Sequence, residues 1–350
     1  MGMFSKERSS RRVRRNSESD QLSADMISPE LMPRPPKRRW PKITFLVVIA
    51  LIVAIGLALG VLYALVKITP LAGENTGRVN VMVMGLDEEA GRTDSLMILS
   101  VDTRGDDHEV AFLSIPRDLV MTVPQFGAMK VNAAYRYGEL NDYPGGGPAL
   151  LKKTLENNLD LPIHYYAVLE FTGFKKLIDT VGGVEVTISQ DLADTEYPNA
   201  GYSGYDPFEL AAGTYNLDGE LALKVVRCRK GTCGDDYGRA ERQQQVLLAF
   251  KQKLSTKETI LNWPRLKALK TTLEEHLHTN FSWRAAAKLG LYLRQISETD
   301  TSRHVLSTSN YLLSDGSSDL YPSDASFAEI KQFIEQIFEQ PSNNLPSAQR

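Results

Sequence analysis

Residues 78–115, RVNVMVMGLDEEAGRTDSLMILSVDTRGDDHEVAFLSI, hold three short apolar segments separated by polar turns. The segments 78–86, 95–101 and 109–115 are bounded by Gly, Asp and charged residues, a pattern typical of strands. The links between them are short, and antiparallel strands can be joined by such short turns. This stretch therefore predicts three consecutive antiparallel strands of one sheet.

Helical and strand patterns alternate along the rest of the chain. Residues 164–171 (HYYAVLEF) and 184–188 (VEVTI) have the character of strands. Helices are predicted at 148–159, 171–181, 218–226, 239–254, 283–296 and 326–338. Residues 190–217, rich in Gly, Asn, Tyr and Asp, predict a long surface segment, and so long a loop inside a domain is often functional. The interleaving predicts a sheet with helices packed on both faces.

Upstream of the sheet, residues 43–66 (ITFLVVIALIVAIGLALGVLYALV) form an apolar run of 24 residues without a charge. That length crosses a bilayer core with some tilt. The preceding 42 residues carry 11 Lys/Arg against 5 Asp/Glu, so the positive-inside rule predicts a cytoplasmic N-terminus and an extracytoplasmic remainder. A cleaved signal peptide is the alternative, but its apolar region would be only about 7–15 residues after a short basic start.

The predicted organisation follows from this division. It comprises a disordered basic cytoplasmic tail (1–42), a transmembrane signal-anchor (43–66), a linker (67–77), a folded extracytoplasmic domain (78–340) and a disordered C-terminal tail (341–350). The basic tail has few apolar residues to bury and suits contact with anionic lipid. Beyond the anchor the chain carries 29 Lys/Arg and 38 Asp/Glu, and this acidity argues against nucleic-acid binding.

The two cysteines, Cys228 and Cys233, are too few for a scaffold built on disulfides. An extracytoplasmic compartment permits a bridge between them. A metal site at this spacing would lack further thiols to complete it. The sequence favours a disulfide here but leaves the reduced state open.

Charged residues fall at corresponding ends of the three predicted strands. They are Asp87 after the first strand, Arg92 and Asp94 before the second, and Arg117 and Asp118 after the third. Antiparallel pairing brings these ends to the same edge of the sheet. The sequence therefore predicts one cluster of carboxylates and guanidinium groups from separate segments.

A second charged cluster occupies residues 227–244. Arg227 and Arg229 share a face only if the chain is extended there, whereas Arg239, Arg242 and Gln243 have helical spacing and share one face. These three are predicted in the first turns of a helix, where free N–H groups suit an anion. Because cations are unfavourable at a helix N-terminus, several of them together suggest a bound anion that offsets the cost.

Taken singly, a carboxylate after a strand is commonly a turn former, and an arginine on a helix is commonly solvated. Together, Asp87 and Asp94 could share a hard cation among arginines that bind phosphate oxygens, as a pyrophosphate–magnesium complex requires. The chain has no GxSxG elbow. His276 and His278 share a helix face poorly and are predicted to be solvated or packed, and the glycines at 145–147 lack a Walker pattern.

At these residues the chain resembles the LytR–CpsA–Psr (LCP) family of bacterial cell-envelope phosphotransferases. The resemblance rests on VMVMGLDEEAGRTDSLMILSVD, VAFLSIPRDLVMTVP, KVNAAY, FTGFKKLIDTVGGVEVTI and GDDYGRAERQQQVL, in the family's order. It implies an α/β domain with a mixed central sheet in three layers. It also implies transfer of a glycopolymer from a polyprenyl-pyrophosphate carrier onto peptidoglycan, with the lipid in a long apolar pocket and Mg²⁺ (or Mn²⁺) at its mouth.

The resemblance assigns roles by position. Asp87 and Asp94 would be the metal-side carboxylates, beside Arg92. The groups holding phosphate oxygens would be Arg92, Arg117, Lys130, Arg227, Arg229, Arg239, Arg242 and Gln243. Asp236 would orient an arginine or a metal-bound water, and Asn132 lies near the site. The general base would be Asp94 or Asp118, and the sequence does not choose between them.

Two other functions stay open at this point. One is a non-catalytic, envelope-linked regulator of the transcriptional-attenuator type. The other is a hydrolase that cleaves the lipid pyrophosphate with water, using the same residues. In either case the predicted partners are membrane lipid and a polyprenyl-linked glycan; the transferase additionally needs a peptidoglycan acceptor.

Overall fold

The computed structural model describes residues 42–87, 92–105, 108–297, 299–314, 316–324 and 326–339. The predicted tail at 1–42, apart from Lys42, lies outside these residues, as do the predicted tail at 341–350 and the predicted turn at 88–91. The chain divides into two units, residues 1–60 and residues 61–350.

A long helix, α1 (Lys42–Ile68), occupies the predicted anchor. Within the described residues it is the one helix long and apolar enough to cross a membrane, over Leu51–Ile68. The residues that follow it, predicted as a linker, are ordered on the folded unit. Leu71 is buried, and Glu74 accepts hydrogen bonds from Lys288 Nζ (2.8 Å) and Tyr292 Oη (2.8 Å).

A six-stranded sheet forms the centre of the folded unit, in the order β11-β6-β1-β2-β3-β12. Its strands are β1 (Arg78–Asp87), β2 (Arg92–Asp102), β3 (Val110–Ser114), β6 (Tyr165–Glu170), β11 (Leu277–Thr279) and β12 (Thr301–Val305). The β1–β2 and β2–β3 pairs are antiparallel, as predicted, whereas β6 pairs in parallel with β1 and β12 with β3. The sheet is therefore mixed.

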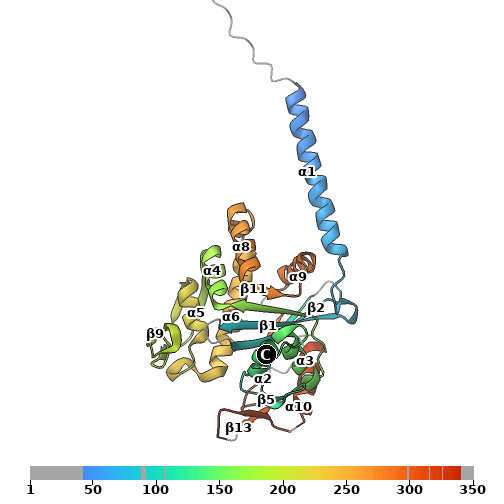
Figure 1. Cartoon of the computed structure of the whole chain (residues 1–350). Helices are drawn as coiled ribbons and strands as arrows, with labels where there is room; N and C mark the ends of the chain where they lie inside the picture. The colour runs from blue at the N-terminus through green and yellow to red at the C-terminus, as the bar shows by residue number, and fades with distance from the viewer. Residues whose placement is uncertain are drawn as a thin grey trace, which may run out of the picture. The chain divides into compact units, whose positions relative to one another are not determined.

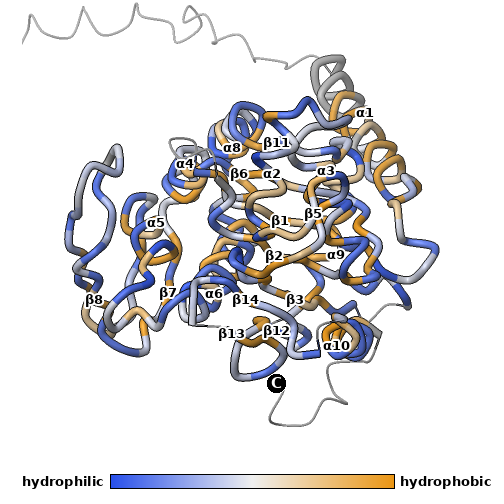
Figure 2. Tube along the Cα trace, turned by 60° about the horizontal axis from the view of Figure 1, so that its bottom comes forward, coloured by the Kyte–Doolittle hydropathy of each residue, from blue (hydrophilic) through white to orange (hydrophobic). Residues whose placement is uncertain are grey.

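Helices cover both faces of this sheet, which confirms the three-layer prediction (Figure 1). One face packs on α2 (Val131–Leu140), α3 (Gly146–Leu159) and α10 (Ala328–Glu339). The other packs on α6 (Asp235–Leu254) and α9 (Trp283–Gln295). The central strands are hydrophobic along most of their length because both of their faces are buried (Figure 2).

The remaining elements flank this core. Among the helices they are η2 (Glu74–Thr76), α4 (Phe171–Val181), η3 (Ala200–Tyr202), α5 (Gly219–Arg227), η4 (Gly231–Cys233), α7 (Lys257–Ile260) and α8 (Trp263–His276). The short strands are β4 (Val120–Val123), β5 (Gly127–Lys130), β7 (Val184–Ile188), β8 (Leu192–Asp194), β9 (Phe208–Leu210), β10 (Gly213–Leu217), β13 (Leu312–Ser314) and β14 (Leu320–Pro322). The sequence analysis did not predict α2 and α8.

A β-bulge interrupts the β1–β2 pairing between Gly85 and Leu86. Gly85 pairs with Ser95 and Leu86 pairs with Thr93, so Asp94 has no opposite residue in the register. Regular alternation would place Asp94 on the same face as Leu96, in the core beneath α2 and α3. The bulge re-aims its side chain to the opposite face, as bulges often do beside functional sites.

Two predictions about the second half of the chain are wrong in detail. The segment 190–217, predicted as a loop, contains β8, η3, β9 and β10. Helix α6 begins at Asp235 rather than at Arg239, after Gly234 with a φ of 72°. Its first turn therefore carries Asp235 and Asp236, and the predicted anion site at the free N–H groups does not include Arg239 directly.

Candidate functional site

The folded unit contains a cavity of about 810 Å³ between the sheet and helices α4, α5, α6 and α8. Most of its wall is apolar: Val83, Met84, Met97, Leu169, Phe171, Phe174, Leu177, Ile178, Leu223, Val226, Val246, Leu247, Phe250, Leu273 and Leu277. These side chains come from both the sheet and the helices, so only the folded chain assembles the wall. A cavity of this size and lining suits a long apolar group.

Charged side chains gather at one part of the cavity wall, which is called the mouth here. Its members are Asp87, Asp94, Arg117, Asp194, Glu196, Arg227, Arg229, Lys230 and Arg239. The two clusters predicted from separate parts of the sequence therefore meet at one cavity. Asp94 and Ser95, consecutive residues of β2 at the bulge, both line it.

Arg117 lies at the centre of the acidic groups. Its Nη1 donates to Asp94 Oδ1 at 2.7 Å, and its Nε lies 3.6 Å from Asp118 and 3.7 Å from Asp236. Burial opposes the charge, but the carboxylates of Asp94, Asp236 and Asp118 raise the pKa of Arg117 above its ordinary value. Arg117 is therefore a fixed cation that joins the sheet edge to α6.

Arg239 is also buried, but nearby carboxylates neutralise its charge less completely than they neutralise the charge of Arg117. Its Nη2 lies 3.3 Å from Asp236 Oδ1. Burial lowers the pKa of Arg239, Asp236 opposes that shift, and the nearby cations Arg117 and Arg229 add to it. An anion bound at the mouth would relieve this repulsion because it would supply the missing negative charge.

Arg227 and Asp87 form the opposite side of the mouth. Arg227 Nη2 lies 3.5 Å from Asp87 Oδ2 and donates to Tyr202 Oη at 2.6 Å, and the guanidinium lies 4.8 Å from the Phe171 ring centroid. Asp87 is 2% exposed, so its charge is held almost wholly within the protein. The Arg229 guanidinium, in contrast, makes no hydrogen bond or ion pair with any residue that the structure describes, and it lines the cavity.

The cavity lining lacks four of the predicted phosphate-binding or catalytic residues: Asp118, Lys130, Asp236 and Arg242. Arg242 is buried and donates to the carbonyl oxygens of Val225 (2.9 Å), Cys233 (2.7 Å) and Cys228. Lys130 Nζ lies 2.9 Å from Asp118 Oδ1, so these two side chains form an ion pair with each other. All three guanidinium nitrogens of Arg242 thus donate to backbone carbonyls and not into the cavity, an arrangement that the helical spacing did not reveal.

Three other residues were predicted to lie at or near the site, and the structure places each of them differently. Gln243 lines the cavity and donates to Val226 O at 3.2 Å. Arg92 pairs with Asp87 in the strand register, and its side chain lies outside the described part of the structure. Asn132 donates its backbone N–H to Arg117 O at 3.2 Å and so supports the segment that carries Arg117.

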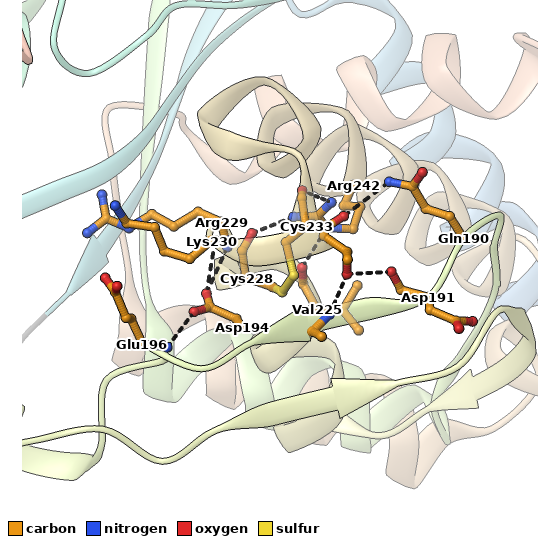
Figure 3. The surroundings of a disulfide bond; sticks show 12 residues. Gln190, Asp191, Asp194, Glu196, Val225, Cys228, Arg229, Lys230, Cys233 and Arg242 are labelled. Carbon is orange, nitrogen blue, oxygen red and sulfur yellow. Dashed lines mark hydrogen bonds between the residues drawn. A yellow bond between two sulfur atoms is a disulfide. The ribbon is translucent and has the colours of Figure 1, made fainter.

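The sequence analysis missed Asp194 and Tyr202, both from the segment 190–217. Asp194 is buried and its Oδ2 accepts the backbone N–H groups of Arg229 (3.1 Å) and Lys230 (3.2 Å) (Figure 3). It therefore fixes the extended chain that presents the Arg229 side chain. No local signal marks Asp194, the last residue of β8, because the backbone groups that it binds lie 35 and 36 residues away.

His276 and His278 do not line the cavity, although Leu277 between them does. Glu170 Oε2 lies 2.7 Å from His276 Nδ1, and Glu170 Oε1 lies 3.2 Å from His278 Nε2. The two rings thus meet one carboxylate although they do not share a helix face, because the chain passes from α8 into β11 between them. The hydrogen bond from His276 is the larger cause of the lowered pKa of Glu170.

Cys228 and Cys233 form a disulfide beside the arginines of the mouth, with both residues fully buried (Figure 3). The sequence had left this bridge open. It closes the loop that carries Arg229, and Arg242 bonds to the carbonyls of both cysteines. Asp194 lies beside the two sulfur atoms, but disulfide sulfurs are not thiolates and this group is not a metal site.

Breaking this bridge is expected to reduce stability. The double variant Cys228→Ser, Cys233→Ser should lose about 2 kcal/mol, because closing a loop of so few residues removes a correspondingly small amount of unfolded-state entropy. Thermal unfolding of the detergent-solubilised protein with and without dithiothreitol measures the effect. The reductant should lower the melting temperature of the wild type and leave the variant unchanged; a wild type insensitive to reductant would contradict the prediction.

Comparison with known proteins agrees with this geometry. The LytR_cpsA_psr family model matches residues 64–335, which is most of the chain. The chain belongs to the LytR–CpsA–Psr family. The match covers the central sheet, the cavity and both charged clusters.

Two curated relatives and one solved structure show the range of this similarity. Regulatory protein MsrR of Staphylococcus aureus is 33% identical over 212 residues, which cover 59% of this chain and 58% of MsrR. The polyisoprenyl-teichoic acid–peptidoglycan teichoic acid transferase TagU of Oceanobacillus iheyensis is 36% identical over 174 residues, 49% of this chain and 50% of TagU. The B. subtilis TagV crystal structure superposes with a TM-score of 0.58 at 24% identity, covering 75% of this chain and 97% of TagV, and shares the fold.

Proposed function

We propose that this protein is a membrane-anchored phosphotransferase that moves a glycopolymer from a polyprenyl-pyrophosphate carrier onto peptidoglycan. The observation that carries the proposal is the single cavity whose wall is apolar over most of its extent and guanidinium-rich at its mouth. A lipid pyrophosphate has this same division between a long apolar chain and a compact anion. The matched segment spans only about half of TagU, whose name describes such a transfer, so that similarity supports the proposal without establishing it.

In this proposal the polyprenyl chain lies along the apolar wall and the pyrophosphate lies at the mouth. Arg117, Arg229 and Arg239 hold its oxygens, with Arg227 at the opposite side. Arginine suits this role because its planar fork matches phosphate oxygens in two parallel hydrogen bonds. Arg229 makes no ion pair among the described residues, and Arg239 is under-neutralised, so both have charge to offer to an anion.

The residues present also fit a divalent cation. Asp87 and Asp94 line the same cavity and offer carboxylate oxygens, which are the ligands that Mg²⁺ prefers, and Mg²⁺ characteristically takes one or two carboxylates together with substrate phosphate and water. When bound, Mg²⁺ (or Mn²⁺) would neutralise charge on the pyrophosphate oxygens. In this proposal Asp87 and Asp94 hold the cation and the arginines hold the remaining oxygens.

The transfer is a substitution at phosphorus. An acceptor hydroxyl oxygen forms a new bond to the phosphorus nearer the glycan, and the bond from that phosphorus to the bridging oxygen breaks. Polyprenyl phosphate leaves with the bridging oxygen and its electron pair, and the hydroxyl proton passes to a base. In this proposal the base is Asp94 rather than Asp118, because Asp94 lines the cavity and Asp118 does not.

The membrane arrangement belongs to the same proposal. The apolar helix Leu51–Ile68 would anchor the chain, with the basic N-terminus in the cytoplasm and the folded unit outside. The lipid carrier, the peptidoglycan and the cavity would then lie on the same side of the membrane. Nucleic acid is not a partner in this arrangement, consistent with the acidic charge beyond the anchor.

A reconstitution experiment tests this function. The full-length protein in detergent is mixed with a polyprenyl-pyrophosphate-linked glycan, magnesium and uncrosslinked peptidoglycan, and products are identified by mass spectrometry. The expected result is glycan joined to peptidoglycan through a phosphodiester, with one polyprenyl phosphate released per transfer. Release of glycan phosphate at the same rate without acceptor would indicate a hydrolase. Donor binding without any turnover would indicate a regulator, the function that the name of MsrR suggests for that relative.

A further inference from the structure

A group of large apolar side chains is exposed where helices α7 and α8 meet. Ile260 ends α7, Leu261 lies in the link and Trp263 begins α8, and their side chains are 39%, 80% and 75% exposed. The surface that these three residues form is called the α8 tip here. A single exposed leucine is ordinary, but tryptophan is usually largely buried. Adjacent exposed side chains of this kind therefore indicate an interaction site.

The exposure of the α8 tip is a feature of the fold, because hydrogen bonds hold its backbone in place. The N–H of Leu261 donates to Lys257 O at 2.9 Å, and Asn262 Oδ1 caps α8 by accepting the N–H of Arg265 at 3.0 Å. Leu269, farther along α8, is 6% exposed and packs in the hydrophobic cluster that includes α4 and α5. One face of α8 is thus bound to the folded unit, and its first residues project apolar groups into solvent.

Basic residues surround the α8 tip. Residues 253–270 contain one acidic residue, Glu258, and the basic residues Lys253, Lys257, Arg265, Lys267 and Lys270, although the chain beyond the anchor has 29 Lys/Arg against 38 Asp/Glu. Lys257 and Lys267 are exposed and form no ion pair with any residue that the structure describes. Tryptophan and leucine beside unpaired lysines match an anionic lipid surface, because the apolar groups enter the headgroup region and the ammonium groups meet lipid phosphates.

The end of the apolar helix is fixed to the same side of the folded unit. The segment Leu51–Ile68 ends directly before Thr69, whose carbonyl oxygen accepts a hydrogen bond from Lys288 Nζ of α9 at 2.8 Å. Helices α8 and α9 lie on the same side of the central sheet (Figure 1). Trp283, the first residue of α9, is 59% exposed. The two tryptophans beyond the anchor are therefore both exposed on this side, and tryptophan is enriched at membrane interfaces.

Helix α8 also connects the α8 tip with the apolar cavity. Leu273 and Leu277 line the cavity, and Leu273 is 38% exposed, so the apolar wall reaches the protein surface along α8. Trp263 and Leu273 lie on this one helix, about 15 Å apart along its axis at a rise of 1.5 Å per residue. A lipid that leaves a bilayer at the α8 tip would therefore have only a short distance to travel to the cavity wall.

We propose that the α8 tip docks the folded unit on the membrane. Leu261 and Trp263 lie among the headgroups of the outer leaflet, and the surrounding lysines contact lipid phosphates. This inference rests on the membrane arrangement in the proposed function and adds to the anchor a second, reversible point of contact. Docking holds the α8 side of the cavity against the bilayer that contains the polyprenyl carrier. The donor can then enter the cavity along α8.

The cysteine content of the chain allows a direct test of this contact. Cys228 and Cys233 are the only cysteines and are joined in a disulfide, so an introduced cysteine is the single free thiol. Full-length Leu261→Cys is labelled with an environment-sensitive fluorophore and reconstituted into phosphatidylglycerol–phosphatidylcholine vesicles that contain nitroxide-labelled lipid. Leu313→Cys is the matched control, because Leu313 is a 57% exposed leucine of β13, on the opposite side of the sheet (Figure 1).

The label at position 261 is expected to shift its emission to shorter wavelength and to be quenched by the lipid nitroxide, whereas the label at position 313 stays in water. In the Leu261→Cys background, Lys257→Gln and Lys267→Gln should each lower the ratio of docked to undocked protein about fivefold in anionic vesicles. A label at 261 as accessible to water as the label at 313 would overturn the inference. So would shielding that rises with protein density and resists the lipid quencher, which would identify a second copy as the occupant.

Activity measurements separate docking from the transfer reaction. The double variant Leu261→Asp, Trp263→Asp should raise the KM for a donor presented in vesicles about tenfold or more and leave the KM for the same donor in detergent micelles unchanged. An equal rise in both would place the effect in the cavity and contradict docking. If the wild type fails to float with vesicles, the proposed membrane arrangement fails together with this inference. If it floats and docks but transfers no glycan, the proposed reaction fails and the docking site stands.

Discussion

Asp94→Asn is expected to lower magnesium-dependent glycan transfer by about a thousandfold. The substitution keeps the size of the side chain but removes a carboxylate charge that serves two proposed purposes, holding the cation and accepting the hydroxyl proton. Loss of a general base alone typically costs about 10²–10⁴ in rate. Asp87→Asn removes only the cation-holding role, so a smaller loss, about a hundredfold, is expected, with partial recovery at high magnesium concentration.

The measurement is turnover against magnesium concentration for each variant, with the melting temperature as a check on folding. Asp118→Asn is the matched control because Asp118 also contacts Arg117 but is bound to Lys130 and does not line the cavity. Its turnover should stay within about threefold of the wild type, since it touches no reacting group. Transfer by Asp94→Asn at the wild-type rate would remove Asp94 from both proposed roles.

Arg117→Ala and Arg239→Ala are expected to weaken binding of the lipid pyrophosphate by about one to two orders of magnitude each. A hydrogen bond to a charged group contributes about 1.5–3 kcal/mol, and each guanidinium would lose such bonds to phosphate. Arg117→Lys should restore only part of the affinity, because an ammonium keeps the charge and loses the planar fork.

Donor Kd, measured by fluorescence with a labelled lipid pyrophosphate, reports this effect directly. Arg303→Ala is the control: Arg303 is an exposed arginine of β12 that does not line the cavity, so its loss should leave the donor Kd unchanged. Donor affinities that match the wild type in both Arg117→Ala and Arg239→Ala would show that these groups only join the acidic side chains to one another.

The two arginines should also differ in their effect on stability. Arg117 is surrounded by three carboxylates, so its removal leaves Asp94, Asp118 and Asp236 to repel one another. Arg239 pairs with Asp236 but is buried near two other cations, so its removal loses one ion pair and also relieves repulsion with Arg117 and Arg229. In the absence of donor, Arg117→Ala should therefore lower the melting temperature more than Arg239→Ala does.

Much of the central sheet was accessible from the sequence because its signals are local. The apolar segments at 78–86, 95–101 and 109–115 are bounded by polar turns, and their short links force antiparallel pairing. From that pairing alone, the ends carrying Asp87, Asp94 and Arg117 had to meet at one edge. The predicted helices at 148–159 and 171–181 likewise correspond closely to α3 and α4.

The site's finer organisation was not accessible in the same way. The β-bulge that turns Asp94 toward the cavity depends on which residues pair across two strands, and single-strand alternation places Asp94 on the wrong face. Arg242 has the helical spacing of a phosphate ligand, yet its guanidinium binds the carbonyls of Val225, Cys228 and Cys233. Helical spacing shows which side chains share a face, but it does not show what that face meets.

The sequence by itself determined the apolar anchor segment, the three-strand meander and the gathering of acidic and basic groups at one sheet edge, because each depends on periodicity or on short connections. Only the tertiary structure decided that this edge opens into an apolar cavity and that Asp194 and Tyr202 support the arginines. Those features join residues far apart in the chain, and their free energy comes from packing and desolvation that no local pattern records.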